Sequence, residues 1–193
     1  MSFFQHHLLI AMPALDDAFF QRSIIYLCEH NTEGAMGIVL NHPLEVSVHD
    51  LLAQLDLVSS DSELTSASAL QHAVLQGGPV QTDRGFVLHR CMHGFRSSMA
   101  FADDLMITTS RDILEAIARD EFQHTYRISL GYAGWSAGQL EQEIADNSWL
   151  LLPVNTDVVN QIIFADNHAD QWQQATAKLG IQPWQLSAQA GHA

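Results

Sequence analysis

Basic residues are scarce in this chain, and lysine is almost absent. Only 8 of its 193 residues are Lys or Arg, against 22 Asp or Glu, so the formal net charge is -14. A polyanion is repelled by the phosphates of nucleic acid and by the anionic surface of a bilayer. The charge balance therefore argues against direct nucleic-acid binding and against membrane partners. The basic residues are almost all isolated arginines, which indicates individual contacts to carboxylates or anions.

Cysteine is nearly absent as well. Cys28 and Cys91 are the only two cysteines, and without a CxxC arrangement they predict neither a disulfide framework nor a typical zinc motif. The first fifteen residues carry no Lys or Arg ahead of their apolar residues, and no apolar run reaches the roughly 18 residues that span a bilayer. We therefore expect a cytoplasmic protein.

The overall composition is that of one globular domain. Hydrophobic residues make up 47% of the chain and charged residues 16%, a profile typical of a chain with a single core. We predict one domain over residues 1–186 and a flexible tail over 187–193. The polar, serine-rich stretch 59–68 is predicted to be an exposed loop.

Short apolar runs rich in branched residues predict eight strands. They cover 8–11, 24–28, 36–40, 73–75, 86–89, 106–108, 126–131 and 149–152. Several of these runs are apolar at every position, which is typical of strands that are buried on both faces.

Helix signals lie between and after these runs. Three predicted helices begin with a capping box, which pairs Ser47 with Asp50, Thr109 with Asp112, and Ser136 with Gln139. Two more helices are predicted over 157–164 and 169–179, the second ended by Gly180. Because strands and helices do not alternate regularly, we predict an α+β fold with a mixed, mostly antiparallel sheet and about five helices.

A cluster of glycines marks the predicted junction between the strand over 126–131 and the helix after it. Gly131, Gly134 and Gly138 fall within eight residues, together with Tyr132 and Trp135. Glycine is favoured where a positive φ or a close backbone approach is needed. We therefore predict a shaped turn at this junction.

Several separated blocks resemble the YqgE/AlgH family of small bacterial proteins, most of them uncharacterised and some described as transcriptional regulators. In chain order the blocks include the stretches LLIAMP, GGPV, RGFVLH, GYAGWSAGQLEQE and NSW. Ala18 stands where the family commonly has proline, and Asp120, Glu121 and Phe122 replace a familiar Gly-Pro turn, which leaves the local loop shape open. The resemblance implies a compact α+β domain with a mixed, partly barrel-like sheet, and it supplies no settled catalytic residues.

One hypothesis for catalysis rests on histidines near acidic and basic groups. His30 follows Glu29 at the end of a predicted strand, and His89 ends another. A histidine beside a carboxylate acts as a general base near neutral pH, because its ordinary pKa is about 6.5. With an arginine to hold an anion, these residues would suit a hydrolase or a transferase. Ser23 lacks the GxSxG context that would mark it as a nucleophile.

A zinc site is an alternative use of the same histidines. The period of two in a strand puts Cys28 and His30 on one face, and it aligns His89 with Cys91 in the same way. Two such strands side by side would present a Cys/His cluster to a metal. Buried cysteine is more often a small hydrophobe. The prediction is therefore no metal and no cofactor, with these four residues as the alternative.

The leading hypothesis is a non-enzymatic binding or regulatory module. A glycine turn at 77–79 would present backbone N–H groups to an anion, with Arg84 adding charge. Tyr132 and Trp135 are of residue types enriched at interfaces. We predict one recognition surface for a protein or a small anionic ligand, formed by Arg22, Gly77, Gly78, Arg84, His89, Tyr132 and Trp135. Any effect on transcription would then be indirect.

Overall fold

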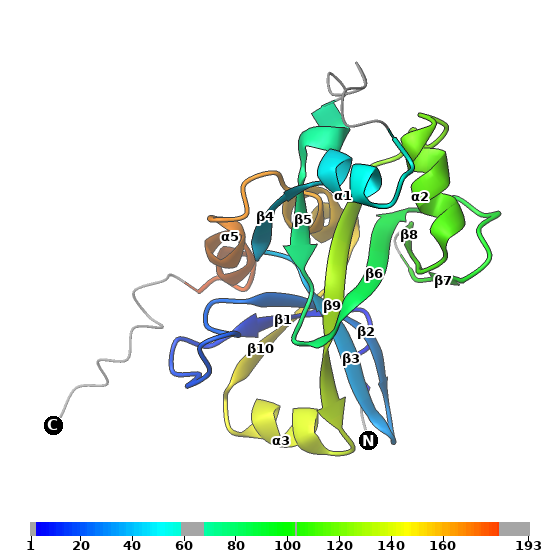
Figure 1. The fold of residues 1–193 in the computed structure, drawn as a ribbon. Coiled ribbons are helices and arrows are strands. Elements are labelled where there is room, and N and C mark those ends of the chain that lie inside the picture. Colours follow the sequence, from blue (N-terminus) through cyan, green and yellow to red (C-terminus); the bar gives the residue numbers. More distant parts are fainter. Residues whose placement is uncertain (1–2, 59–67, 103, 182–193) are drawn as a thin grey trace, which may run out of the picture.

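The computed structural model describes residues 3–58, 68–102 and 104–181, and the predicted loop and tail lie mostly outside them. The fold is α+β, with helices around one curled sheet whose strand order is β10-β1-β2-β3-β9-β6-β8-β7, β5 joining β9 from the side (Figure 1). The strands are β1 (His7–Ala11), β2 (Ile24–Asn31), β3 (Gly34–Val39), β4 (Pro43–Ser47), β5 (Ala73–Gln76), β6 (Val80–Arg90), β7 (Ser98–Ala100), β8 (Leu105–Thr108), β9 (Tyr126–Ser136) and β10 (Trp149–Pro153). The helices are α1 (Val48–Gln54), η2 (Ser68–Gln71), α2 (Arg111–Ala118), α3 (Gln139–Ala145), α4 (Thr156–Val158), η3 (Val159–Ile163) and α5 (Gln171–Lys178).

All eight predicted strands are present, and the predicted α+β class with a mixed, partly barrel-like sheet is confirmed. Two further strands, β4 and β7, were not predicted. β4 begins at a proline, and all three residues of β7 are exposed. Neither strand therefore shows the buried apolar run by which the others were recognised.

Strand β9 is the longest strand of the sheet together with β6, and it connects two groups of strands. The first part of β9 pairs with β6. Strand β5 pairs with β9 in parallel, with Leu75 opposite Ser129. Its last four residues pair with β3, from Ala133 opposite Gly37 to Ser136 opposite Gly34. In Figure 1 this strand runs through the centre of the molecule from the α1 and α2 end to α3.

The predicted glycine turn between strand and helix is present at Gly138, whose φ is 76°, but Gly131 and Gly134 lie inside the strand. Strand β9 continues to Ser136, and Gly131, with a φ of 73°, bends it inside the sheet. A Cβ at Gly131 would overlap the carbonyl oxygen of Gly78, and a Cβ at Gly78 would overlap the backbone of Tyr132. The two glycine-containing segments therefore meet in space and allow two backbones to cross in close contact.

Of the three predicted capping boxes, one is confirmed in full. Ser47 and Asp50 form the predicted capping box of α1. Helix α2 instead has Ser110 as its N-cap residue, and α3 begins after Gly138. In α3 only half of the predicted box exists, since the Gln139 side chain accepts from the backbone N–H of Ser136 at 3.0 Å.

The later helices were predicted more closely. The predicted helix over 157–164 is present as α4 followed by the π-helix η3, and α5 ends at Lys178, shortly before Gly180. No helix within the described ranges combines the length and the apolar character that a membrane crossing requires.

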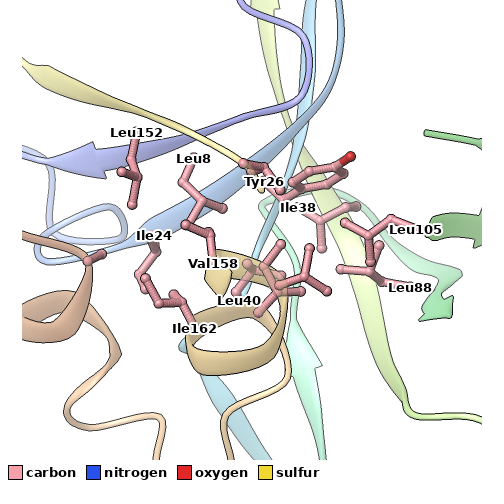
Figure 2. Close-up of a cluster of buried hydrophobic side chains, with 14 of the residues drawn as sticks. Leu8, Ile24, Tyr26, Ile38, Leu40, Leu88, Leu105, Leu152, Val158 and Ile162 are labelled. Carbon is pink, nitrogen blue, oxygen red and sulfur yellow. The ribbon is translucent and has the colours of Figure 1, made fainter. Parts of the chain in front are cut away.

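The sheet is covered on both faces. Alternate residues of β2, Ile24 and Tyr26, enter a cluster closed by η3 and α5, while Ile25 and Leu27 enter a second cluster near α3. Figure 2 shows the first cluster, in which strand side chains meet Val158 and Ile162. A third cluster lies beneath α1 and α2. This double coverage explains the unbroken apolar runs in the sequence.

Candidate functional site

Two adjacent depressions lie where β2, β3, β6 and β9 come together. The first, which we call the outer cleft, has a volume of about 490 Å³ and is lined by Glu29, Asn31, Glu33, Gly34, Ala35, Met36, Val80, Arg84, Phe86, Tyr132, Gly134, Trp135 and Ser136. The second, the inner slot, has a volume of about 380 Å³ and is lined by Cys28, Glu29, Met36, Arg84, Phe86, Arg96, Ser97, Ser98, Met99, Phe101, Ile107 and Thr109. Four residues line both, so the two depressions share a wall formed by Glu29, Met36, Arg84 and Phe86.

A β-bulge in β2 places Glu29 in this shared wall. The pairing with β3 shifts by one residue between Leu27 and Glu29, so that Glu29 lies opposite Met36. The extra residue is Cys28, and the bulge turns Cys28 and Glu29 toward the same side of the sheet. His30 then lies opposite Ala35, on the other face. The prediction that Cys28 and His30 share a face is therefore wrong, because the bulge breaks the period of two.

The end of β9 contributes alternate residues to the outer cleft and to the core. Tyr132 and Gly134 lie on the cleft side, and the Tyr132 ring packs edge-on against Phe86 at 6.0 Å. The ring of Trp135 is buried on the opposite side, where only 7% of the residue is exposed. Its indole N–H donates to Glu143 at 2.8 Å. Trp135 therefore supports the cleft from behind and does not present a flat aromatic surface to a partner.

Gly134 keeps the floor of the outer cleft open. It is not among the glycines with a positive φ, and an added Cβ would meet only the Tyr132 ring, at 3.4 Å. The backbone conformation therefore does not demand glycine at this position. What glycine provides here is the missing side chain, which leaves room above β9.

Arg84 and Arg96 are the two arginines that line the depressions. Arg84 donates a hydrogen bond to Gln81 at 3.4 Å and lies over the ring of Phe86 at 5.3 Å. Neither guanidinium lies within ion-pair distance of a described carboxylate. The other arginines are engaged, in the pairs Arg90–Asp104, Arg111–Glu115, Arg119–Glu115 and Arg127–Asp166, and in the contact of Arg22 with the Trp172 ring.

The two histidines proposed for catalysis lie away from both depressions. His89 is fully buried, with one ring nitrogen 2.7 Å from the Arg90 carbonyl and the other 2.8 Å from the Thr108 hydroxyl. Burial lowers the pKa of His89. His30 is 3% exposed and accepts a hydrogen bond from the backbone N–H of Phe4 at 3.0 Å. Neither histidine is brought together with Glu29, so the predicted His/Glu/Arg arrangement is not assembled.

Ser23 has a histidine neighbour that the sequence did not indicate. Its hydroxyl lies 3.0 Å from Nε2 of His42, and burial lowers the pKa of that histidine. Ser23 is fully buried. This pair is therefore closed to a substrate and acts as an internal hydrogen bond near the start of β2.

The four residues of the zinc alternative are not gathered. Cys28 belongs to the cluster closed by η3 and α5, and burial raises the pKa of its thiol. Cys91 contacts His93 at 3.4 Å, outside strand β6. Across the ranges described, no group of three or more His, Cys, Asp and Glu side chains is arranged to hold a metal ion.

Three of the predicted binding residues have structural contacts of their own. The N–H of Gly77 donates to the Leu130 carbonyl at 2.7 Å, so it is not available to an anion. Gly78 is packed against β9, as described above. Arg22 stacks on Trp172 of α5 and lines neither depression.

Sequence reasoning missed Arg96 and the apolar side chains of the slot. Arg96 follows the stretch His93-Gly94-Phe95, which matches no binding motif. The residues that line the slot with it come from β2, β3, β6, β7 and β8, five strands that only the folded sheet brings together. That no described carboxylate lies within ion-pair distance of the Arg96 guanidinium is likewise visible only in three dimensions.

Comparison with known proteins gives consistent results for the whole chain. A family model described as AlgH-like matches residues 8–184. A UPF0301 protein of Shewanella oneidensis is 50% identical over 193 residues, and another from Shewanella sp. strain W3-18-1 is 51% identical over 194 residues, each match covering 100% of both chains. The solution structure of the AlgH protein from Pseudomonas aeruginosa has a TM-score of 0.75 and 41% identity, with 100% of this chain and 97% of that chain covered. A crystal structure from Corynebacterium diphtheriae, at 21% identity, a TM-score of 0.63 and coverage of 97% and 91%, is similar in fold alone.

Proposed function

This chain belongs to the AlgH-like family, and we propose that it is a non-enzymatic binding or regulatory module that recognises a small anionic ligand at Arg84. The observation that carries the proposal is the position of this side chain. Arg84 stands in the wall shared by the outer cleft and the inner slot. A guanidinium in such a wall offers a fork of N–H donors to a carboxylate or a phosphate.

The charge balance makes an uncommitted arginine notable. With 22 acidic residues against 8 basic ones, an average arginine has a surplus of carboxylates to pair with. Four arginines do so, as the ion pairs above record. Arg84 instead lies over Phe86 and faces a depression. This arrangement suits a side chain whose anionic partner arrives from solution.

The placement of the histidines favours binding over catalysis. Both nitrogens of the buried His89 are engaged by protein groups, and His30 lies on the opposite face of β2 from Glu29. General acid–base chemistry requires the proton-transferring group within hydrogen-bond reach of the substrate. A ligand in either depression would not reach these two rings.

A regulatory role would be exercised through ligands or protein partners rather than through DNA. The net charge of -14 opposes the approach of a nucleic-acid backbone. A module of this kind would influence transcription only indirectly. We also propose that it acts in the cytoplasm.

The proposal is tested by measuring thermal unfolding of the full chain with a panel of small carboxylates and phosphates. A ligand at about 100 times its Kd stabilises the folded state by about 2.7 kcal/mol, which corresponds to several degrees in Tm for a chain of this size. We expect at least one anion to raise Tm in the native protein. The variant Arg84→Gln should lose this stabilisation, because it removes the charge that holds the anion.

Arg119→Gln is the matched control for the charge change. Arg119 directly follows helix α2, and its side chain is 65% exposed, contacts Glu115 at 4.0 Å and lies outside both depressions. It should respond to the panel as the native protein does. Equal stabilisation of Arg84→Gln, or no response of the native protein to any anion, would overturn the proposal. Turnover of a panel member that is lost in His30→Ala or His89→Ala would replace it with the hydrolase or transferase alternative.

A further inference from the structure

The two depressions differ in the sign of their charge. The outer cleft is lined by Glu29 and Glu33 in addition to Arg84. The inner slot contains Arg84 and Arg96 with only Glu29. An anion that binds Arg84 is therefore attracted toward the slot and away from the second carboxylate of the cleft. Two guanidinium groups that line one small slot also repel each other, and a bound anion removes that repulsion.

Polar groups around the slot are suited to an anionic headgroup. The hydroxyl-bearing residues Ser97, Ser98 and Thr109 line it together with the two arginines. Ser98 is engaged with the Thr108 hydroxyl at 2.7 Å. The carboxylate of Asp112 accepts from the Ser110 hydroxyl at 2.6 Å and from the backbone N–H of Arg96 at 3.0 Å. The Arg96 side chain forms no described ion pair, although its charge is one of the smaller causes, after the Ser110 and backbone hydrogen bonds, that lower the pKa of Asp112.

The rest of the slot is apolar. Phe86 and Ile107 are nearly buried, and Met36 and Phe101 pack against the same hydrophobic cluster. Cys28 also belongs to this lining, and because burial raises the pKa of its thiol it stays neutral and acts as a small hydrophobe. A volume of about 380 Å³ is near the lower end of the range of small-molecule sites, roughly 300–1,000 Å³.

Exposed apolar side chains point to the same place. Only three large hydrophobic residues of the described ranges are exposed, namely Phe3, Val80 and Met99. Val80 lines the outer cleft, and Met99, 50% exposed, lines the slot. Met99 belongs to β7, a three-residue strand at the edge of the sheet. An apolar ligand body in the slot would cover this methionine.

We infer that the inner slot binds an amphiphilic anion, which has one carboxylate or phosphate headgroup on an apolar body of limited size. Arg84 and Arg96 hold the headgroup, and the body lies against Phe86, Phe101 and Met99. This inference rests on the proposed function, since both use Arg84. It adds Arg96, the apolar requirement and the choice of the slot over the outer cleft.

The test is a titration of the isotope-labelled full chain, followed by NMR, with octanoate, acetate and 1-octanol. Octanoate should bind at least about tenfold more tightly than acetate, because each buried methylene group adds affinity. It should also bind at least about tenfold more tightly than 1-octanol, because the alcohol lacks the charge that the guanidinium groups recognise. Comparison of octanoate with octyl phosphate then identifies the preferred headgroup.

Two variants examine the slot without disturbing the core. Arg96 lines the slot but not the outer cleft. Arg96→Gln should weaken octanoate binding by about tenfold through loss of a charge-assisted hydrogen bond. Met99→Glu places a carboxylate at the exposed edge and should weaken binding to a similar extent. Ala100→Glu makes the same charge change on the same strand but outside the slot lining. Ala100→Glu should weaken binding less than Met99→Glu does, because neighbouring residues of a strand point to opposite faces. Arg119→Gln should stay within about twofold of the native protein, since surface charges at a distance are screened.

The outcomes separate this inference from the proposed function. If acetate and octanoate bind alike and depend on Arg84 but not on Arg96, the slot inference fails while anion recognition at Arg84 stands. If 1-octanol binds as tightly as octanoate and Arg96→Gln has no effect, the slot is merely apolar and the inference fails. If no anion binds at all, both proposals fail.

Discussion

Arg127 and Arg84 lie on the neighbouring strands β9 and β6, and they show opposite fates of an arginine in an acidic protein. Arg127 is 3% exposed. Its guanidinium donates to the carbonyls of Tyr126 at 3.0 Å, Phe164 at 2.6 Å and Ala165 at 3.1 Å, and to the Asp166 carboxylate at 2.8 Å. Arg84 is exposed and has one hydrogen bond, to Gln81 at 3.4 Å.

The difference separates an arginine used for folding from one available for recognition. The carbonyls of Phe164 and Ala165 follow η3, where a helix leaves acceptors without partners inside the helix. Arg127 satisfies them and links that end to β9, so its donors are consumed by the fold, apart from the buried Nε. Neither Arg84 nor Arg96 satisfies backbone carbonyls in this way within the described part of the chain. Under the proposals above, these two side chains serve a ligand rather than stability.

Replacement of Arg127 should give the largest effect. Arg127→Met leaves the two carbonyls after η3 without a donor, and two unsatisfied buried acceptors together typically cost about 2–6 kcal/mol. We expect the free energy of unfolding in urea to fall by this amount. Arg127→Lys should recover only part of it, because an ammonium group cannot reproduce the planar fork. A loss below about 1 kcal/mol would show that the fold does not depend on Arg127 to satisfy the carbonyls after η3.

The glycines provide a second comparison of the same kind. Gly78→Ala should destabilise the protein by about 1–3 kcal/mol, because its Cβ overlaps the Tyr132 backbone and the crossing must open. Gly134→Ala should change stability by less than about 0.5 kcal/mol, since its Cβ meets only a side-chain ring at ordinary contact distance. Urea unfolding of the two variants side by side measures the contrast. Equal losses would mean that Gly134 is required by the fold rather than by the cleft.

These two comparisons also show which features the sequence could predict. The capping box of Ser47 and Asp50 depends on residues three apart, so it was recognised correctly. The strand runs were equally local, because a strand buried on both faces is apolar throughout. The bulge at Cys28 depends on the pairing of β2 with β3 and left no sign in the residues themselves. The same holds for the bend at Gly131, where β9 changes partners.

The candidate site was predictable only in part, for the same reason. Arg84 and Tyr132 were singled out and do line the outer cleft, while His89 and Arg22 turned out to be engaged elsewhere. An exposed arginine and a buried one look alike in a sequence. Their roles are decided by whether acceptors from distant segments, such as the end of η3, surround them.

Stability should depend on pH through His72, which lies beside Arg127. The His72 ring lies 3.2 Å from the guanidinium of Arg127, and its pKa is lowered, first by burial and then by Arg127. The unfolded chain therefore takes up a proton near the ordinary pKa of about 6.5 while the folded chain does not. The stabilisation is complete above that pH and declines as the pH falls below it.

The measurement is the free energy of unfolding in urea at pH 7.5 and pH 5.5. The native protein should be less stable at pH 5.5, with His42 and His89 contributing in the same direction, because burial lowers the pKa of each. His72→Gln keeps an acceptor for Arg127 but removes one titrating group, so its pH dependence should be shallower. An unchanged pH dependence in this variant would assign the effect to the other two histidines.

The smallest expected effect on stability is that of replacing Arg84 or Arg96. Arg84→Gln and Arg96→Gln remove no described ion pair, and surface substitutions of this kind usually change stability by less than about 0.5 kcal/mol. Urea unfolding of each variant and of the double variant should therefore match the native protein, even where anion binding is lost. A loss of 1 kcal/mol or more in either variant would place that arginine in the same class as Arg127. Unchanged stability together with lost binding would mean that the two arginines are kept for a ligand, since the fold itself gains nothing from them.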